Sequence, residues 1–383
     1  MQALILAAGE SSRFWPLNQK HKSLIKIMGR PLIYYTIKGF KKAGIKEIII
    51  VQGPQKDVEK ELKFLKELSS LRIKYVVQVK PKSTADAIWQ ARNLLKEPFL
   101  LCWAHRVDIK EYLPSFLKKF ALTKNKILFL AAKTERPGDY GMVKFKEKKF
   151  LEVVEKPDRG KEPSDIRTAG LYIFPVNFFA HYKRNLIETI NLLIKEKGAE
   201  FVLAKKEPLS LKYPWDLFSV RDYLFKNSKT KIYIGKNCRL SKNCYLRGFV
   251  SLGDNCKIGH SVEIKNSIIG DNSQIPHLSY LGDSIIGENC NIGAGTITAN
   301  LRFDRKPIKA KVKGKLIDTG REKFGCVLGN NTQTGINVSL MPGVLIGSNC
   351  QIGPNSVVFE NIEDETNFYT RQNFEKFKRA SRT

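Results

Sequence analysis

Apolar and polar positions follow two different patterns along the chain, and the change between them falls near residue 228. Before that point, short apolar runs alternate with amphipathic stretches of helical period. The runs are residues 3–7, 47–52, 73–79, 99–104 and 127–133, and the clearest amphipathic stretches are 55–70 and 84–95. Strands separated by helices are typical of βαβ units. We therefore expect residues 1–227 to form an α/β domain with a mostly parallel sheet.

From residue 228 onward, a six-residue period replaces the helical one. An aliphatic residue recurs every six positions, followed by Gly and then Asp or Asn, as in "VSLGDNCKIGHSVEIKNSIIGDNS" (250–273). Three such units make one triangular coil of a parallel β-helix, in which Gly or Asn takes the positive φ of each corner. A basic insertion at 301–324 interrupts the repeat, and residues 374–381 predict a short C-terminal helix. We expect this second domain to span 228–383.

Composition limits the classes of ligand that the chain is expected to bind and the cellular compartment in which it is expected to lie. The formal net charge is +29, but the Lys and Arg residues are spread along the chain without a block of like charge. That distribution favours small phosphate ligands over nucleic acid, although a Lys-rich proteome or a hot habitat would also produce it. No apolar run reaches about 18 residues, and the start does not resemble a signal peptide, so we expect no membrane segment. The seven cysteines form no C-x-x-C pair. This indicates the reducing cytoplasm and no metal site built from cysteines.

A loop containing Gly follows the first predicted strand, in "LILAAGESSRFWPLNQKHKSLIK" (4–26). Backbone N–H groups after Gly9 can bind phosphates, and Arg13 and Lys22 can neutralise their charge. A strand followed by a tight turn explains Gly9 equally well.

Residues 1–225 as a whole resemble the sugar-1-phosphate nucleotidyltransferases, whose first loop reads L-A-A-G-x-G-T-R…P-K. Further motifs of that family follow in family order: Gln78, "STADA" (83–87), "YGMV" (140–143), "VEKP" (154–157), "TAGLYIF" (168–174) and "YPWDL" (213–217). The resemblance implies a Rossmann-like fold. It also implies a nucleotide site formed by Gly9, Arg13, Lys22, Gln78, Thr84, Gly141 and Glu155.

The positions at which that family binds its catalytic Mg²⁺ differ in this chain. Ala104-His105 replaces Gly-Asp after a strand, and Ser210 stands where a second carboxylate or amide is usual. Mg²⁺ prefers hard oxygen ligands, for which imidazole is a poor substitute. Further departures from the family pattern are Ser11, Ser83 and Thr168. We therefore expect no metal site and a degenerate nucleotide site. Mg²⁺ and UTP would act there only if Asp108 or Asp216 bound the metal from a shifted position.

In the repeat, "IPHLSYLGDSIIGENCNIGAGTITAN" (275–300) breaks the six-residue rule at His277. We expect His277 on the outer face of a coil and His260 at an ordinary turn position. The segment resembles the acetyltransferase domain of the bifunctional glucosamine-1-phosphate acetyltransferase and N-acetylglucosamine-1-phosphate uridylyltransferase family, and is closer to archaeal-type members. This implies a left-handed β-helix that forms a homotrimer, with His277 and Asn300 contributed by different chains.

The same resemblance implies the roles of individual residues. His277 matches the general base, Arg247 and Lys265 the sugar-phosphate ligands, and Tyr280 a substrate contact. Asn291 and Asn300 match groups that orient the amine and the base, and Ala294 and Asn330 match acetyl-CoA contacts. The chemistry is consistent, because an amine attacks a thioester only when it is unprotonated, and His is a suitable base near neutral pH. The basic insertion at 301–324 could meet the phosphates of coenzyme A.

Three hypotheses follow from the sequence. The chain is an acetyl-CoA-dependent glucosamine-1-phosphate N-acetyltransferase with a degenerate first domain, or the full bifunctional enzyme that also uses UTP, or a non-catalytic regulatory subunit. The complete set of site residues in the second domain favours an enzyme. His105 distinguishes the first hypothesis from the second.

Overall fold

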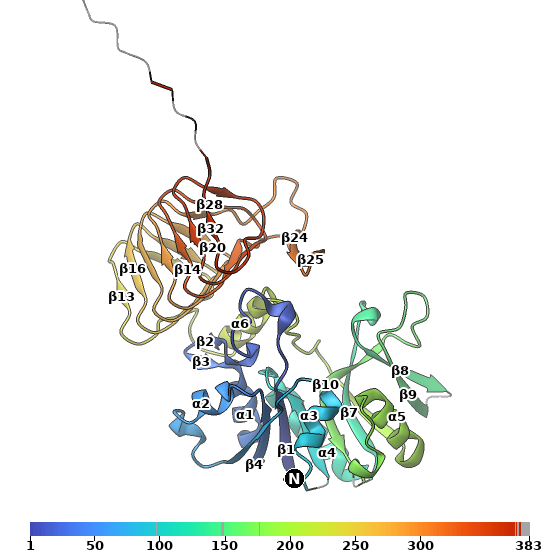
Figure 1. Ribbon diagram of the computed structural model, residues 1–383. Helices are drawn as coiled ribbons and strands as arrows, with labels where there is room; N and C mark the ends of the chain where they lie inside the picture. The colour runs from blue at the N-terminus through green and yellow to red at the C-terminus, as the bar shows by residue number, and fades with distance from the viewer. Residues whose placement is uncertain are drawn as a thin grey trace, which may run out of the picture. The chain divides into compact units, whose positions relative to one another are not determined.

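The computed structural model describes residues 1–96, 98–123, 125–146, 149–175, 177–371, 373, 375 and 376. The chain forms two compact units (Figure 1): unit 1 comprises Met1–Phe14 and Asn18–Leu224, and unit 2 comprises Trp15–Leu17 and the chain from Phe225 onward. The main division lies close to the change of sequence pattern. Of the helix expected at 374–381, residues 374 and 377–381 lie outside the described residues.

Unit 1 contains one large sheet with the order β11-β7-β10-β6-β1-β4-β5, and β8 and β9 extend from β10. Its strands are β1 (Gln2–Ala7), β4 (Glu47–Gln52), β5 (Arg72–Val77), β6 (Phe99–Trp103), β7 (Ile127–Lys133), β8 (Gly141–Lys146), β9 (Lys149–Glu155), β10 (Ile166–Phe174) and β11 (Ala199–Leu203), beside the short pair β2 (Lys26–Ile27) and β3 (Arg30–Pro31). β1 is parallel to β4 and β6, as the βαβ pattern predicts. β10 is antiparallel to both β6 and β7, so the sheet is mostly parallel with a reversed strand inside it.

Helices cover both faces of this sheet (Figure 1). They are α1 (Leu32–Lys42), α2 (Asp57–Leu62), α3 (Thr84–Gln90), α4 (Ile109–Leu122), α5 (Leu186–Lys197) and α6 (Asp216–Lys226). Successive residues of β1 point to opposite faces: Ile5 packs in a core with Ile37 of α1, and Leu4 packs in a second core with Ile88 of α3. The carboxyl ends of the strands therefore remain open between two helical layers, which is where ligands of such sheets bind.

Unit 2 is a parallel β-helix with three sheets, and each coil contributes one strand to each sheet. The first sheet holds β12 (Ile232–Tyr233), β15 (Val250–Leu252), β18 (Ile268–Ile269), β21 (Ile285–Ile286), β26 (Cys326–Leu328) and β29 (Val344–Ile346). The second holds β13 (Arg239–Leu240), β16 (Lys257–His260), β19 (Gln274–His277), β22 (Asn291–Ile292), β27 (Gln333–Thr334), β30 (Gln351–Ile352) and β32 (Asn367–Phe368). The third holds β14 (Tyr245–Arg247), β17 (Glu263–Lys265), β20 (Tyr280–Gly282), β23 (Ile297–Thr298), β28 (Ser339–Leu340) and β31 (Val357–Val358).

A ladder of asparagine side chains runs along the corner between the first and second sheets. Each amide donates to the side-chain oxygen of the next Asn, at 3.0 Å from Asn272 to Asn289 and at 3.1 Å from Asn289 to Asn331. These residues have positive φ, 57° at Asn289, which Asn tolerates better than most residues. Cys290, the next residue, is buried in the core. The sequence "Gly-x-Asn-Cys" therefore marks a corner of the β-helix.

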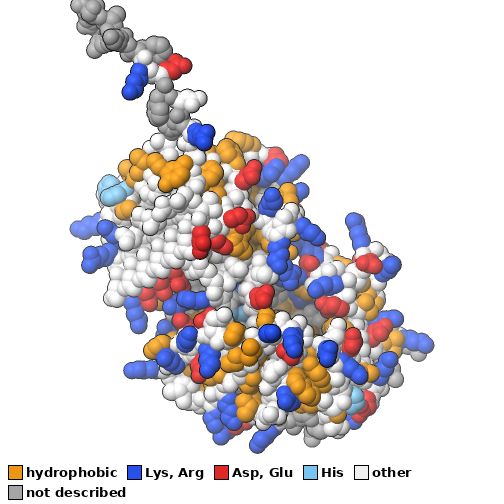
Figure 2. Space-filling view, in the orientation of Figure 1, with side chains coloured by type: hydrophobic (Ala, Val, Ile, Leu, Met, Phe, Trp, Pro, Cys, Tyr) orange, Lys and Arg blue, Asp and Glu red, His pale blue; other side chains and the backbone are white. Residues whose placement is uncertain are grey.

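The insertion at 301–324 forms a β-hairpin of β24 (Ile308–Val312) and β25 (Lys315–Arg321). Ile308, Ala310 and Val312 are buried while Lys309 and Lys311 are exposed, so one face packs and the other is basic. In the described part of the chain, no helix is long and apolar enough to cross a membrane. Figure 2 shows Lys and Arg side chains spread over the visible face, with Asp and Glu among them.

Candidate active sites

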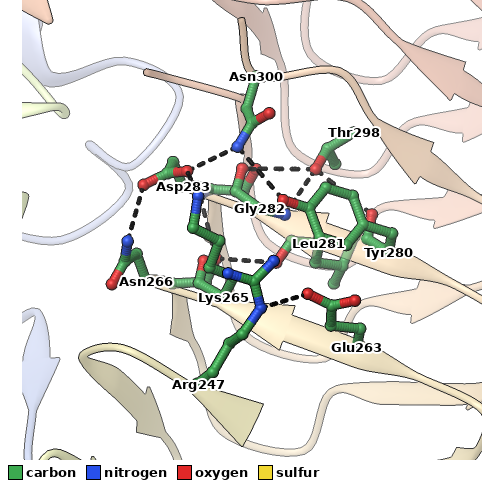
Figure 3. A network of polar contacts seen from close by, with 12 residues as sticks. Arg247, Glu263, Lys265, Asn266, Tyr280, Leu281, Gly282, Asp283, Thr298 and Asn300 are labelled. Carbon is green, nitrogen blue, oxygen red and sulfur yellow. Dashed lines mark hydrogen bonds and ion pairs between the residues drawn. The ribbon is translucent and has the colours of Figure 1, made fainter. Parts of the chain in front are cut away.

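Four of the predicted site residues of unit 2 lie together on its third sheet (Figure 3). Arg247 and Lys265 are register partners on β14 and β17, and Tyr280 and Asn300 follow on the next two coils. Gly282 is the register partner of Lys265 on β20. A Cβ there would lie 2.4 Å from the Tyr280 hydroxyl and 2.8 Å from the Asn300 amide nitrogen. The glycine therefore provides the space in which these side chains meet.

Asp283 is the centre of this group, and the sequence reasoning assigned it no role. Its carboxylate accepts hydrogen bonds from Asn300 Nδ2 at 2.6 Å and Asn266 Nδ2 at 3.3 Å, and pairs with Lys265 Nζ at 3.3 Å. The Asp283 side chain is only 7% exposed and that of Lys265 14%, so this ion pair is largely shielded from water. The signal was present in the "LGD" of the quoted motif, but only the register shows where that Asp points.

A second carboxylate that the sequence reasoning missed, Glu263, accepts a hydrogen bond from Arg247 Nε at 2.6 Å. This bond raises the pKa of Arg247 further above its usual range. Burial raises the pKa of Tyr280, and the nearby Asp283 adds to the effect, so the phenol stays neutral at physiological pH. The cluster thus presents two cations, two carboxylates and a neutral hydroxyl to one small surface region.

His277 lies at the end of β19 and is exposed, immediately before the corner residue Leu278 with its φ of 46°. His260 is its register partner at the end of β16 and is exposed as well. His277 therefore lies on the outer face of a coil, whereas the expectation that His260 lies instead at an ordinary turn position is wrong. The two histidines occupy equivalent backbone positions on adjacent coils, because the repeat continues through "IPHLSY" without a break.

The remaining predicted residues of unit 2 lie on other parts of the β-helix. Asn291 is exposed on β22, in the second sheet, beside Gln274. Three residues further along the same register, Ala294 on the following coil lies next to His277. Asn330 is at a different corner, after the first sheet, where its Oδ1 accepts the Glu288 backbone N–H at 2.8 Å. Within one chain, Asn330 therefore does not join His277 and Ala294.

In unit 1, the predicted nucleotide residues line two adjoining cavities of about 420 and 500 Å³. Arg13, Lys22 and Thr84 line both. Gly9 and Gln78 line the smaller one, and Gly141 and Glu155 the larger one. The structure thus brings together all seven residues, from positions 9 to 155.

Two departures from the nucleotidyltransferase pattern have local hydrogen-bonding roles in the loops of the cavity. Ser11 replaces a Gly yet has a φ of 53°, and its hydroxyl accepts the Lys22 backbone N–H at 3.3 Å. Ser83 also replaces a Gly and acts as the N-cap of α3, accepting the Asp86 backbone N–H at 3.1 Å. Both serines therefore stabilise loops that line the cavity through their hydroxyl groups.

The residues of this cavity do not fit a catalytic Mg²⁺ ion. His105 and Ser210 line the same cavity wall, as their alignment with the family's metal positions implies. Burial and the neighbouring Lys22 hold the pKa of His105 well below its usual value, so its imidazole is neutral. Among the described residues, no group of three or more His, Cys, Asp or Glu side chains could hold a metal ion. Mg²⁺ needs several oxygen ligands, which His105 and one hydroxyl do not provide.

The two carboxylates that could replace the missing ligands are engaged elsewhere. Asp108 pairs with Arg106 at 3.0 Å and accepts the Leu209 backbone N–H at 2.9 Å, fully inside the protein. Asp216 accepts the backbone N–H groups of Lys212 and Tyr213 at 2.6 and 2.9 Å. Both carboxylates hold backbone segments in place, and neither is among the residues that line the two cavities.

Comparisons with known proteins agree with this architecture. The family model for nucleotidyl transferases matches residues 2–200, the one for the GMPPB C-terminal domain matches 228–341, and the one for six bacterial transferase hexapeptide repeats matches 325–360. The chain is 32% identical to the bifunctional sugar-1-phosphate nucleotidylyltransferase/acetyltransferase of Sulfurisphaera tokodaii, over 94% of this chain and 98% of the relative. It is also 32% identical to the bifunctional protein GlmU of Methanocaldococcus jannaschii, over 99% of this chain and 100% of the relative.

A solved structure from Bacillus anthracis, whose title names a candidate glucose-1-phosphate thymidylyltransferase, has the same fold. It covers 60% of this chain and 97% of its own, with a TM-score of 0.52 and 20% identity. The expected fold class is thus confirmed: a mostly parallel α/β nucleotidyltransferase domain followed by a left-handed parallel β-helix of hexapeptide repeats. The chain belongs to the family of bifunctional sugar-1-phosphate nucleotidylyltransferase/acetyltransferases.

Proposed function

We propose that unit 2 transfers an acetyl group from acetyl-CoA to the amine of glucosamine-1-phosphate. The single observation that carries this proposal is the cluster of Arg247, Lys265, Tyr280 and Asn300 around Asp283. Two cations on one sheet suit a sugar phosphate, while the carboxylate and the amide suit an amine and hydroxyl groups. The names of the relatives support an acetyltransferase as well.

In this proposal, His277 is the general base. As the amine nitrogen attacks the thioester carbonyl carbon, the imidazole accepts the proton that the nitrogen loses. Backbone N–H groups near Ala294, next to His277 in the register, would stabilise the tetrahedral oxyanion. The carbon–sulfur bond then breaks, and the proton from His277 returns to the departing coenzyme A thiolate. The amide and the free thiol are the products, and the base is regenerated.

The proposed assembly is a homotrimer in which Asn300 of one chain completes the site of His277 from another. Exposed apolar side chains follow the third sheet and the corner before it: Tyr245 (60% exposed), Leu278 (61%), Ile297 (43%), Ile336 (53%) and Val357 (39%). A second copy of the β-helix would cover them, which supports the oligomer. The exposed Lys309 and Lys311 of the hairpin would then be free to meet coenzyme A phosphates. All seven cysteines are free thiols, which supports a cytoplasmic location.

Two other functions compete with a monofunctional acetyltransferase. The relatives' names favour the fully bifunctional enzyme, in which unit 1 would use UTP with Mg²⁺. The poor fit of unit 1 to that metal favours a chain that only acetylates. The third candidate, a regulatory subunit without catalysis, leaves the complete residue cluster of unit 2 unexplained.

Two product assays on the full chain test these alternatives. Thiol release is measured with acetyl-CoA and glucosamine-1-phosphate, and pyrophosphate release with UTP, N-acetylglucosamine-1-phosphate and Mg²⁺. We expect thiol without pyrophosphate. Release of both products would establish the bifunctional enzyme, and release of neither would favour the regulatory subunit.

A further inference from the structure

We propose that the larger cavity of unit 1 binds a chain of phosphate groups through protein cations alone, without a divalent metal ion. Unit 1 would then be a binding site for a nucleoside polyphosphate rather than a site of nucleotidyl transfer. This inference uses unit 1 only and does not depend on the acetyltransferase activity proposed for unit 2.

Six cationic side chains line the cavity, Arg106, which pairs with Asp108, and Arg184 among them. Arg13 comes from the first loop, Lys22 from the short helix Lys22–Leu24, Arg167 from β10, and Lys212 from the segment before α6. They repel one another: burial and the nearby Arg13 lower the pKa of Lys22 to about 8, and burial lowers that of Lys212. Such a concentration of positive charge is unfavourable unless an anion neutralises it.

Arg167 gives the strongest support for an anion-binding site. Its side chain is only 4% exposed, and its Nε has no hydrogen-bond partner among the described residues. Its contacts to the Thr168 and Pro208 carbonyls are long, at 3.4 and 3.5 Å. The nearest carboxylate, Glu207, is 3.7 Å away and 70% exposed. The guanidinium lies over the Tyr140 ring, 4.1 Å from its centroid, but it has no close anionic partner, which a buried guanidinium normally has.

The same geometry disfavours a metal ion. Where a metal ligand would be needed, the cavity has the neutral His105 and the Ser210 hydroxyl, close to Lys22. Two carboxylates also line the cavity, but Asp139 already pairs with Lys212 at 3.3 Å and Glu155 with Lys156 at 3.4 Å. The protein's own cations therefore replace the charge that a metal ion would bring to a polyphosphate.

Isothermal titration of the full chain tests the proposal, with UTP as ligand in buffer containing either EDTA or MgCl₂. We expect binding in EDTA with a Kd within about threefold of that in MgCl₂, the difference reflecting screening alone. Arg167→Gln should weaken binding in EDTA about tenfold or more. Lys126→Gln is the matched control, because it removes one charge from an exposed lysine paired with Glu200, outside the cavity. It should leave the Kd unchanged.

A second ligand, inorganic tripolyphosphate, distinguishes two sources of the same chemistry. Tighter binding of UTP supports a nucleoside polyphosphate site, and equal binding supports a site that recognises phosphates alone. Binding that appears only with MgCl₂ would overturn the proposal, as would binding in EDTA that Arg167→Gln and Lys22→Met both leave intact. Thermal unfolding of each variant shows independently whether the chain is folded.

Discussion

His277 and His260 are register partners on adjacent coils of the β-helix, at the ends of β19 and β16. Both are exposed, and both precede a corner residue with positive φ. Their side-chain contacts differ: Asn243 Nδ2 lies 3.4 Å from His260 Nδ1. His260 is therefore a matched control for His277, the proposed base, because both occupy equivalent backbone positions.

Replacing His277 with Ala should lower kcat for acetyl transfer about 10²- to 10⁴-fold, the usual contribution of a general base. His260→Ala removes the same side chain from the equivalent position and should leave kcat nearly unchanged. Initial rates of thiol release at saturating substrates measure both. Near-normal turnover of His277→Ala, or an equal loss in both variants, would refute the assignment of the base.

Asp283→Asn should destabilise unit 2 and impair use of the sugar phosphate. Lys265 would keep its charge in a largely buried place without an anionic partner, which costs about 3 kcal/mol. Asn300 would also lose its charged acceptor, so kcat/KM for glucosamine-1-phosphate should fall. Thermal unfolding and initial rates measure the two effects.

Glu263→Gln is the control for stability, because the Arg247–Glu263 pair is much more exposed and such pairs contribute little. We expect little change in Tm for this variant. If both variants had the same Tm, Asp283 would not be the centre of the network.

Restoring carboxylates in unit 1 should make nucleotide binding depend on metal. His105→Asp combined with Ser210→Asp places two hard oxygen ligands in the wall of the cavity. For this double variant we expect UTP to bind at least about tenfold more tightly with MgCl₂ than with EDTA, because the metal neutralises phosphate charge. Each single variant should show a smaller dependence. If the Kd of the double variant for UTP were the same with MgCl₂ and with EDTA, the expected metal position would be wrong.

Binding of UTP in EDTA should weaken as the pH rises through about 8. The pKa of Lys22 is about 8, because burial, Arg13 and Lys212 lower it more than Asp216 raises it. A polyphosphate favours the protonated amine, so above that pH the protein must take up a proton in order to bind. The pKa of His21 is about 3, so this buried neighbour stays neutral throughout.

Titrations at pH 7 and pH 9 measure this dependence, and buffers of different ionisation enthalpy detect the proton uptake. Lys22→Arg is the control, since a guanidinium stays charged over the whole range. Its Kd should vary little with pH. The same pH dependence in both proteins would assign the effect to another group.

The asparagine ladder should contribute measurably to the stability of unit 2. Asn289→Ala removes two side-chain hydrogen bonds and places a Cβ without a polar group at a φ of 57°. Relative to Gly, a Cβ at this φ costs about 1–2 kcal/mol. Asn289→Gly loses the same bonds without that strain, so the Tm should fall in the order wild type, Asn289→Gly, Asn289→Ala. Equal values for the Gly and Ala variants would show that the corner is not strained.

The alternation of apolar runs and helical stretches was sufficient to predict the α/β class and most of its parallel strands. It did not predict β10, which runs antiparallel between β6 and β7. Apolar content indicates that a segment is buried, but it does not give the direction of the strand. That direction depends on how the strand pairs with its neighbours in the folded sheet. Similarly, the expected helix over 55–70 is the shorter α2 followed by a single turn at Lys66–Leu68.

The six-residue period by itself determined the β-helix, because the repeat of one aliphatic residue and one corner residue is local. Only the tertiary structure decided which side chains share a site. Asp283 meets Asn266 and Asn300 over separations of 17 residues, and Asp108 accepts a hydrogen bond from Leu209 across 101 residues. The coil register sets the first separation and the packing of a distant loop sets the second. The substitutions at the metal positions could be read from the sequence, whereas the central place of Asp283 and the engagement of Asp108 became visible only in three dimensions.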